Sequence, residues 1–284
     1  MYFYTSYHDT LLFKEETLPV LLENEAENNL LIASILKYES THLEDHVMGT
    51  VKSEKGEIQA IIGKVTPYSL CIYAKEDTKC QEVLSFLAKI MVERQIAFQG
   101  IVGNEHLIDV FSTFYSIYQN VRPRVRMYLN VYKLTELIPL VKAKGRLRPI
   151  TYEDLYFLPY WLRDFQKDCH FPTSTLMQNF RAIEHIIKHQ FAYIWEDDHP
   201  VSIAAKGRQF MNGCAVCQVY TPPYYRGKQY ASSCVAALSE KLLAEGNTFT
   251  VLYADRNNIS SNKVYQKMGY KLIGHVKDIV FTKY

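Results

Sequence analysis

A cationic corner separates a strand-like run from a helical run in residues 219–242, VYTPPYYRGKQYASSCVAALSEKL. Arg226, Gly227 and Lys228 stand at that junction. A strand that runs into the start of a helix aims backbone N–H groups at one point, and the helix dipole adds partial positive charge there. Two cations and a conformationally free glycine would strengthen such an anion site. Spacing alone leaves two readings open, a phosphate site and an ordinary surface turn.

The elements that must position this corner follow an α/β order in which apolar periodicity alternates between helical and strand spacing. In the second half we expect helices over 151–169, 174–190, 228–246 and 258–269, and β-runs over 191–209, 213–220, 248–254 and 270–281. In the first half we expect helices over 17–37, 78–95 and 104–119, and β-runs over 57–65, 69–74, 100–103 and 124–134. The shared order predicts an internal duplication.

The domain organisation follows from the length of 284 residues and from one change in composition. Residues 134–148, LTELIPLVKAKGRLR, carry a proline, a glycine and several basic side chains, which is typical of a junction. We therefore expect an N-terminal domain at 1–133, a linker at 134–148 and a second domain at 149–284.

The bulk composition removes several classes of partner. Lys plus Arg number 32 against 30 for Asp plus Glu, so the net charge of +2 gives no reason to expect nucleic acid or an anionic membrane. Apolar runs stay well below the ~20 residues of a membrane-spanning helix, and no secretory signal is evident, so we expect a cytoplasmic protein. Six scattered cysteines are typical of reduced thiols.

No metal site is expected from the histidine and cysteine patterns. Cys214 and Cys217 would point to opposite faces of a strand. His185 and His189 share a helix face, but the glutamate of an H-E-x-x-H motif is missing and no third ligand is evident.

The corner and the segment that follows it resemble the two C-terminal signature motifs of the GNAT superfamily of acyl-CoA-dependent N-acyltransferases. The pyrophosphate loop of that family, usually R-G-x-G-x-A, is matched at Arg226, Gly227, Tyr230 and Ala231. Its asparagine-to-tyrosine helix and the strand after it are matched at Asn258, Ser261, Asn262, Tyr265, Gly269 and Tyr270. The resemblance covers about residues 149–284, whereas for the first half it rests on the order of elements.

The resemblance implies a fold of two GNAT-like α/β domains, each a central mixed, mostly antiparallel sheet flanked by helices, with the first domain degenerate. It also implies acetyl-CoA, or a related acyl-CoA, as cosubstrate and an unidentified primary amine as acceptor. The residues it assigns to the cosubstrate are Val219, Tyr220, Thr221, Arg226, Gly227, Lys228, Gln229, Tyr230, Ala231, Asn258, Ser261 and Asn262.

The implied mechanism can be checked against residue chemistry. A backbone N–H between Gln218 and Thr221 is the expected donor to the oxyanion, and the prolines at 222 and 223 would let the neighbouring strand splay open. Tyr265 is the implied general acid, because a phenol with a pKa of ~10 is protonated at neutral pH and can protonate a departing thiolate.

The general base stays open. Seven acidic residues lie in the same domain, and deprotonation through water is a further alternative. Two of them, Asp164 and Asp168, share a helix face that should border the acceptor cleft. The seven are Glu153, Asp154, Asp164, Asp168, Glu196, Asp197 and Asp198.

Gln229 motivates a rival reading, because the family usually has glycine at this position. A side chain among the diphosphate donors could weaken the loop and leave a non-catalytic acyl-CoA-binding or interaction module. A general nucleotide-phosphate binder is the third reading. In the first half, Glu76 and Asp77 stand at the corresponding helix start and would repel pyrophosphate, so we expect that half to wall the acceptor site or support the catalytic half.

Overall fold

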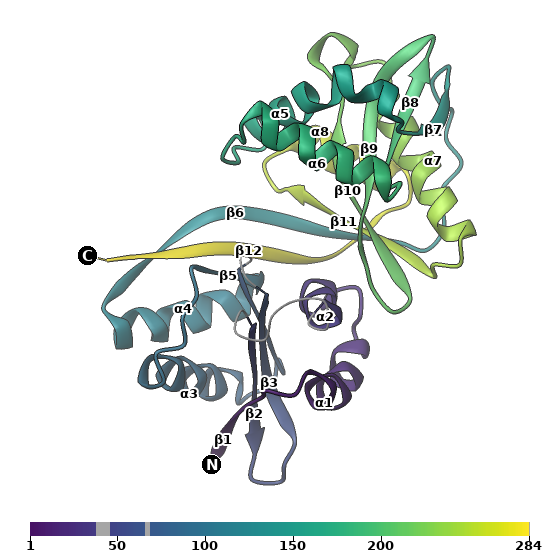
Figure 1. Cartoon of the computed structure of the whole chain (residues 1–284). Helices are drawn as coiled ribbons and strands as arrows, with labels where there is room; N and C mark the ends of the chain where they lie inside the picture. Colours follow the sequence, from purple (N-terminus) through teal and green to yellow (C-terminus); the bar gives the residue numbers. More distant parts are fainter. Residues whose placement is uncertain (38–45, 66–68, 284) are drawn as a thin grey trace. The chain divides into compact units, whose positions relative to one another are not determined.

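The computed structural model describes residues 1–37, 46–65 and 69–283, and they form two compact units (Figure 1). Unit 1 comprises Met1–Val131, Ala254–Ile259 and Leu272–Tyr284. Unit 2 comprises Tyr132–Tyr253 and Ser260–Lys271.

The sheet of unit 1 has the strand order β1-β2-β3-β4-β5-β12-β6. The first four strands pair antiparallel, β4 and β5 pair parallel, and β5 and β12 pair antiparallel. The strands are β1 (Tyr2–Ser6), β2 (His46–Ser53), β3 (Ile58–Val65), β4 (Leu70–Ala74), β5 (Gly100–Asn104), β6 (Val121–Leu134) and β12 (Lys271–Lys283).

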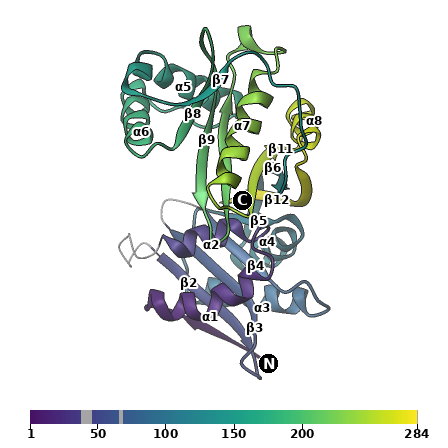
Figure 2. The same cartoon turned by 90° about the vertical axis from the view of Figure 1, so that its right-hand side faces the viewer.

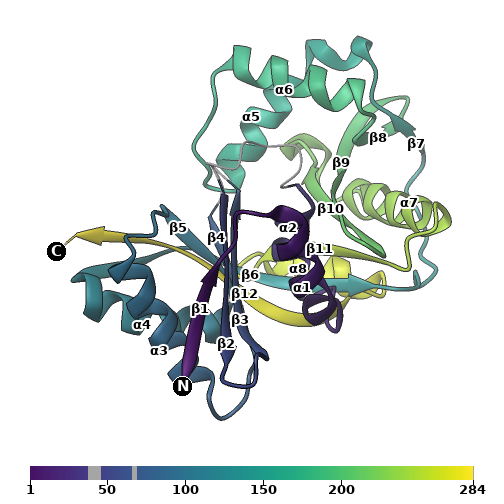
Figure 3. The ribbon, with the colours of Figure 1, turned by 60° about the horizontal axis from the view of Figure 1, so that its bottom comes forward.

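Two helices cover each face of this sheet (Figures 1 and 3). On one face lie α1 (Thr10–Leu22) and α2 (Asn29–Leu36), and on the other α3 (Cys80–Glu93) and α4 (Glu105–Gln119). The single helix expected at 17–37 is wrong, because residues 23–28 form turns between α1 and α2. Asn104 caps α4 by accepting from the backbone N–H of His106 and Leu107 at 2.9 and 3.3 Å.

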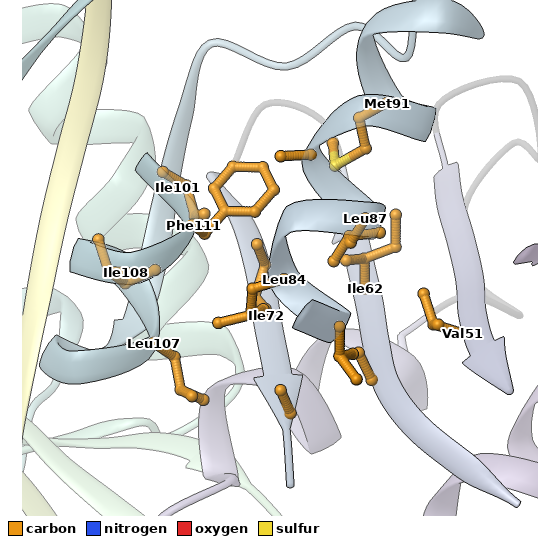
Figure 4. Close-up of a cluster of buried hydrophobic side chains, with 14 of the residues drawn as sticks. Val51, Ile62, Ile72, Leu84, Leu87, Met91, Ile101, Leu107, Ile108 and Phe111 are labelled. Carbon is orange, nitrogen blue, oxygen red and sulfur yellow. The ribbon is translucent and has the colours of Figure 1, made fainter. Parts of the chain in front are cut away.

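One hydrophobic core of unit 1 lies between the sheet and the helices α3 and α4 (Figure 4). Leu84 and Leu87 from α3 and Phe111 from α4 are at most 1% exposed. They pack with strand residues such as Ile62 and Ile72, as the alternation of the strands and the helical spacing predict.

Unit 2 repeats the pattern with the strand order β11-β10-β9-β8-β7. Strands β7 to β10 pair antiparallel, and β10 and β11 pair parallel. The strands are β7 (Arg146–Pro149), β8 (Ala192–Asp197), β9 (His199–Gln209), β10 (Gly213–Tyr220) and β11 (Phe249–Asp255).

Helices α5 (Leu158–Asp168) and α6 (Leu176–Lys188) lie on one face of the unit 2 sheet, and α7 (Tyr230–Ala244) lies on the other (Figure 2). Helix α8 (Ile259–Lys267) precedes β12. The described residues also form two short 3₁₀ turns, η3 (Tyr152–Tyr156) and η4 (Pro223–Tyr225). Leaving the 3₁₀ turns aside, both halves follow the order β-α-α-β-β-β-α-β-α-β, so the predicted α/β class and internal duplication are confirmed.

The compact units differ from the predicted segments 1–133 and 149–284 at the last strand. Strand β12 pairs with β5, with Val276 opposite Asn104 and Val280 opposite Gly100, and therefore belongs to unit 1. Part of the expected linker is ordered on unit 2, because the Trp195 indole N–H donates to the Lys144 carbonyl at 3.0 Å. Where the folding domains begin and end stays a prediction.

Candidate functional site

Strand β10 separates from β11 before it reaches the corner. Their parallel ladder runs from Gly213 opposite Phe249 to Val216 opposite Leu252 and ends there. Gln218 then takes a left-handed backbone conformation with φ +49°, within a register shift against β9. The separation thus begins before the prolines at 222 and 223, so the expectation that they open the sheet is wrong. A bulge in β10 accounts for the divergence, because bulges bend a strand and interrupt its pairing.

The end of β10 is fixed by hydrogen bonds to β9. The Ser202 hydroxyl lies 3.2 Å from the Tyr220 carbonyl oxygen and 2.8 Å from the Thr221 hydroxyl oxygen. Burial raises the pKa of Tyr220 to about 12, and the nearby carboxylates of Asp164 and Asp168 add to the rise. The diverging strand end is therefore anchored to β9, and the Tyr220 phenol is neutral at physiological pH.

The corner presents exposed backbone between η4 and α7. Gly227 has φ +78°, and no atom lies within 4 Å of the position that a Cβ would occupy there. Gln229 is exposed and also left-handed, with φ +62°. Its side chain makes no capping hydrogen bond to α7, and the first turn of that helix has no acidic residue. The first N–H groups of a helix have no intrahelical acceptor, so this corner can receive an anion.

Arg226 ties the corner to α5. Its Nε donates to the Thr221 carbonyl at 2.9 Å, and its Nη2 donates to Asp168 Oδ2 at 2.5 Å. The two charged side chains are 49% and 48% exposed. The structure thus brings Arg226 and the end of β10 together through Thr221, while Lys228 is exposed beside them.

Tyr230, at the first position of α7, is tied to the β8–β9 hairpin. Its hydroxyl donates to Asp197 Oδ2 at 2.6 Å. This hydrogen bond is the main cause that raises the pKa of Tyr230 and lowers the pKa of Asp197. In this hairpin β8 ends at Asp197 and β9 begins at His199, within the β-run expected over 191–209.

Tyr265 is buried in unit 2 among aromatic rings. Its ring centroid lies 6.3 Å from that of Tyr132 and 6.1 Å from that of Tyr270. Burial is the largest cause that raises its pKa well above the ordinary value, followed by Tyr270 and Cys169. The phenol is therefore protonated at neutral pH, and its role as the general acid stays a prediction.

The remaining residues of the second motif divide between the two units. The Asn262 side-chain oxygen accepts from the Tyr132 hydroxyl at 2.8 Å, so this amide helps to seat α8 within unit 2. Ser261, like Ala231 of the first motif, belongs to unit 2, whereas Asn258 belongs to unit 1. A joint role of Asn258 with the corner stays a prediction.

Comparison with known proteins agrees with this geometry. The FR47-like protein family model matches residues 201–278, which include β10, the corner and α8. No curated protein matches the chain closely enough to count as a relative.

Several solved structures match almost the whole chain. A GCN5-related N-acetyltransferase from Sphaerobacter thermophilus is 11% identical with a TM-score of 0.63, covering 98% of this chain and 94% of its own. A GNAT-family acetyltransferase from Colwellia psychrerythraea is 9% identical with a TM-score of 0.57, covering 99% and 100%. A tandem GNAT protein from the clavulanic acid biosynthesis pathway is 9% identical with a TM-score of 0.54, covering 98% of each chain.

The chain has a tandem GNAT fold. At these identities the solved structures establish the fold alone, and the fold does not by itself fix the chemistry.

Within this GNAT fold, most of the expected base candidates are engaged in structural contacts. Asp154 is 3% exposed, caps η3 and accepts two hydrogen bonds from Arg148 at 2.8 Å. Glu196 accepts from Arg148 at 2.6 Å and forms an ion pair with Arg146 at 3.1 Å. Asp198 pairs with Lys144. These contacts explain the charged residues of the hairpin and of β7 without a catalytic role.

Two contacts of the site were not predicted from the sequence. Asp168 was expected as a base candidate and not as the ion-pair partner of Arg226. Ser202, which is fully buried in β9, was not expected to bind the end of β10. A lone serine in the apolar run PVSIAA was the available signal, because a buried hydroxyl needs a partner.

The histidine and cysteine pairs have structural surroundings. The rings of His185 and His189 lie 4.4 Å apart, and His189 stacks on Phe191. Cys214 is fully buried, and both Cys214 and Cys217 are free thiols. Across residues 1–37, 46–65 and 69–283, no three His, Cys, Asp or Glu side chains gather as metal ligands, and no helix is long and apolar enough to cross a membrane.

Proposed function

We propose that this protein transfers an acetyl group from acetyl-CoA to a primary amine by direct attack in a ternary complex. The observation that carries the proposal is the anion-accepting start of α7 beside the diverging end of β10. More generally, a GNAT fold with this corner supports acyl transfer from an acyl-CoA.

The residues of the corner fit a diphosphate. The backbone N–H groups of residues 227–231 and the exposed Lys228 would hold it, because no acidic side chain in the first turn of α7 opposes an anion. Arg226 is the second cation, and its pairing with Asp168 makes its charge only partly available.

The strand end would hold the reacting group. Backbone N–H groups of residues 218–221, which the β11 ladder does not use, would polarise the thioester carbonyl and stabilise the oxyanion. The neutral amine forms the new C–N bond, the C–S bond breaks, and the sulfur leaves as a thiolate. Tyr265 would give its proton to that thiolate, while the proton of the amine leaves to water or to a carboxylate such as Asp164.

Binding is tested by titrating the full chain with acetyl-CoA, CoA and ATP in a calorimeter. We expect acetyl-CoA and CoA to bind and ATP to bind at least tenfold more weakly, because ATP lacks the pantetheine arm that would lie along β10. Equal affinity for ATP would contradict an acyl-CoA site and favour the nucleotide-phosphate reading.

Turnover is tested by thiol release from acetyl-CoA over a panel of primary amines. The variant Tyr265→Phe should lose most of kcat and keep its acetyl-CoA affinity, and the half-buried Tyr193→Phe in β8 is the matched control with normal kcat. Full activity in Tyr265→Phe would remove this residue as the acid.

A second candidate function is a non-catalytic acyl-CoA-binding module. It is favoured by Gln229 at a glycine-type position and by the structural contacts of Asp154 and Glu196. Acetyl-CoA binding without thiol release on any amine of the panel would support the module and exclude the transferase.

A further inference from the structure

Unit 1 contains a cavity of about 170 Å³ at the place where β4 and β5 separate. The ladder between these strands ends with Ile72 opposite Gly103. The residues that follow in both strands line the cavity, together with α2, the turn before it and the start of β12. The volume is roughly ten times what one water needs.

The cavity has an apolar floor and a polar rim. The buried floor side chains are Leu31, Ile72, Leu107, Val131 and Val276, of which Ile72 and Leu107 are labelled in Figure 4. The polar rim side chains are Asn24, Glu27, Asn28, Glu76, Asn104 and His275. Within the described part of the chain, no Lys or Arg lines the cavity.

The helix start beside this cavity does not fit a diphosphate. Asp77 Oδ1 accepts from the backbone N–H of Lys79 at 2.8 Å, and the Asp77 carbonyl accepts from Cys80 N–H at 3.1 Å. These acceptors occupy N–H groups that remain available at the start of α7. Glu76, at the cavity rim, adds a negative charge and accepts from the Asn104 amide at 3.1 Å.

The electrostatic surroundings of the cavity are negative. Burial first, and then the charges of Glu23 and Glu76, raise the pKa of Tyr73, which also lines the cavity. Burial first, and then Glu76 and Asp77, raise the pKa of the neighbouring Cys80 thiol. A cavity of this kind disfavours anions and favours a cation that brings a short apolar part.

We propose that the cavity of unit 1 binds a small organic ammonium compound, with its cationic head at Glu27 and Glu76 and its carbon chain on the floor at Ile72 and Leu107. Amide oxygens of the rim can accept further N–H groups of the head. The site is separate from the acyl transfer proposed for unit 2, and it holds whether or not the α7 corner binds acetyl-CoA.

The test is a methyl NMR titration of the full chain with ethanolamine, and with ethylene glycol as the neutral analogue of similar size. Ethanolamine should shift the methyl signals of Ile72 and Leu107, and ethylene glycol should bind at least tenfold more weakly because it lacks the charge. Equal binding of both compounds, or no shift at these methyls, would overturn the proposal.

Variants separate charge from shape. The double variant Glu27→Gln with Glu76→Gln should weaken ethanolamine binding about tenfold, whereas Glu57→Gln, an exposed glutamate between β2 and β3, should leave it unchanged. Gly274→Val tests the same cavity without removing a charge, because a Cβ at Gly274 meets no atom within 4 Å and the added side chain would occupy the cavity.

These results also distinguish the site from the proposed function. Ethanolamine shifts confined to methyls of unit 2 would refute the cavity site and leave acyl transfer intact. Shifts at Ile72 and Leu107 in a protein that does not bind acetyl-CoA would support the cavity site and count against the transferase. Unchanged ethanolamine binding in both the double variant and Gly274→Val would also refute the cavity site.

Discussion

Replacing Gln229 with glycine should stabilise unit 2 and tighten acetyl-CoA binding. The left-handed backbone at φ +62° costs a residue with a Cβ roughly 1–2 kcal/mol, and glycine adopts it freely. Glycine also makes the unfolded chain more flexible, which lowers the free energy of unfolding by about 0.4–1 kcal/mol. The difference is a net gain of about 0.8 kcal/mol, which corresponds to a rise in Tm of roughly 3 °C for a unit of this size.

The chain offers a matched control for this change. Gln95 is also exposed and left-handed, with φ +53°, but it follows α3 in unit 1. Differential scanning calorimetry should show a similar gain for Gln95→Gly and for Gln229→Gly, because the backbone cost is the same. Only Gln229→Gly should lower the Kd for acetyl-CoA, by about two- to fivefold, since only this side chain stands among the proposed diphosphate donors.

Two results would refute this reasoning. A lower Tm in Gln229→Gly would mean that the corner is not left-handed at residue 229. An equal gain in acetyl-CoA affinity from Gln95→Gly would mean that the effect is global and not located at the start of α7.

Three further changes test the packing and the charges of the two units. Tyr270→Phe removes a buried hydroxyl that lies 2.8 Å from the hydroxyls of Ser239 and Thr250. Chemical denaturation should show a free energy of unfolding lower by about 1–3 kcal/mol, and an unchanged value would contradict these contacts. Asp168→Asn frees Arg226 from its ion pair, so calorimetry should show tighter acetyl-CoA binding. The gain should be at most about fivefold, because a half-exposed ion pair contributes at most about 1 kcal/mol. Weaker binding would contradict the idea that Asp168 competes with the diphosphate for Arg226. Glu105 has a lowered pKa, chiefly because Arg256 donates a hydrogen bond to its carboxylate. The ionised Glu105 therefore stabilises the folded state fully above the unfolded pKa of ~4.3, and this stabilisation is lost as the pH falls through the folded pKa. Glu105→Gln should therefore flatten the fall in Tm of unit 1 below about pH 4.3, and an unchanged slope would exclude this pair as a source of acid sensitivity.

The order of elements could be predicted because each half carries clear apolar periodicity and turn residues. The place of the last strand could not. The run YKLIGHVKDIVF indicates a strand whichever partner it has, and its pairing with β5 joins residues more than 170 positions apart, as Val276 opposite Asn104 shows. Local propensity carries no information on such a partner, so β12 was expected with its own half.

The corner was visible in the sequence, but its geometry was not. The types at Arg226, Gly227 and Ala231 marked a strand-to-helix junction, and Gln229 was noted as a departure in residue type. Gln229 has a φ of +62°, and β10 opens at the bulge at Gln218. A glutamine adopts many backbone conformations, so the residue type did not predict either of these features. The ion pair of Arg226 with Asp168 depends on α5 packing beside the corner, which no local pattern specifies.

The two units show that this fold supplies an opening and that the helix start decides its chemistry. Each parallel ladder stops short of the strand end, after Ile72 in β4 and after Val216 in β10. Helix α3 then begins with its N–H groups engaged by Asp77 and with Glu82 in its first turn. Helix α7 begins without a side-chain cap or an acidic first turn. The same backbone opening should therefore favour a cation in unit 1 and an anion in unit 2.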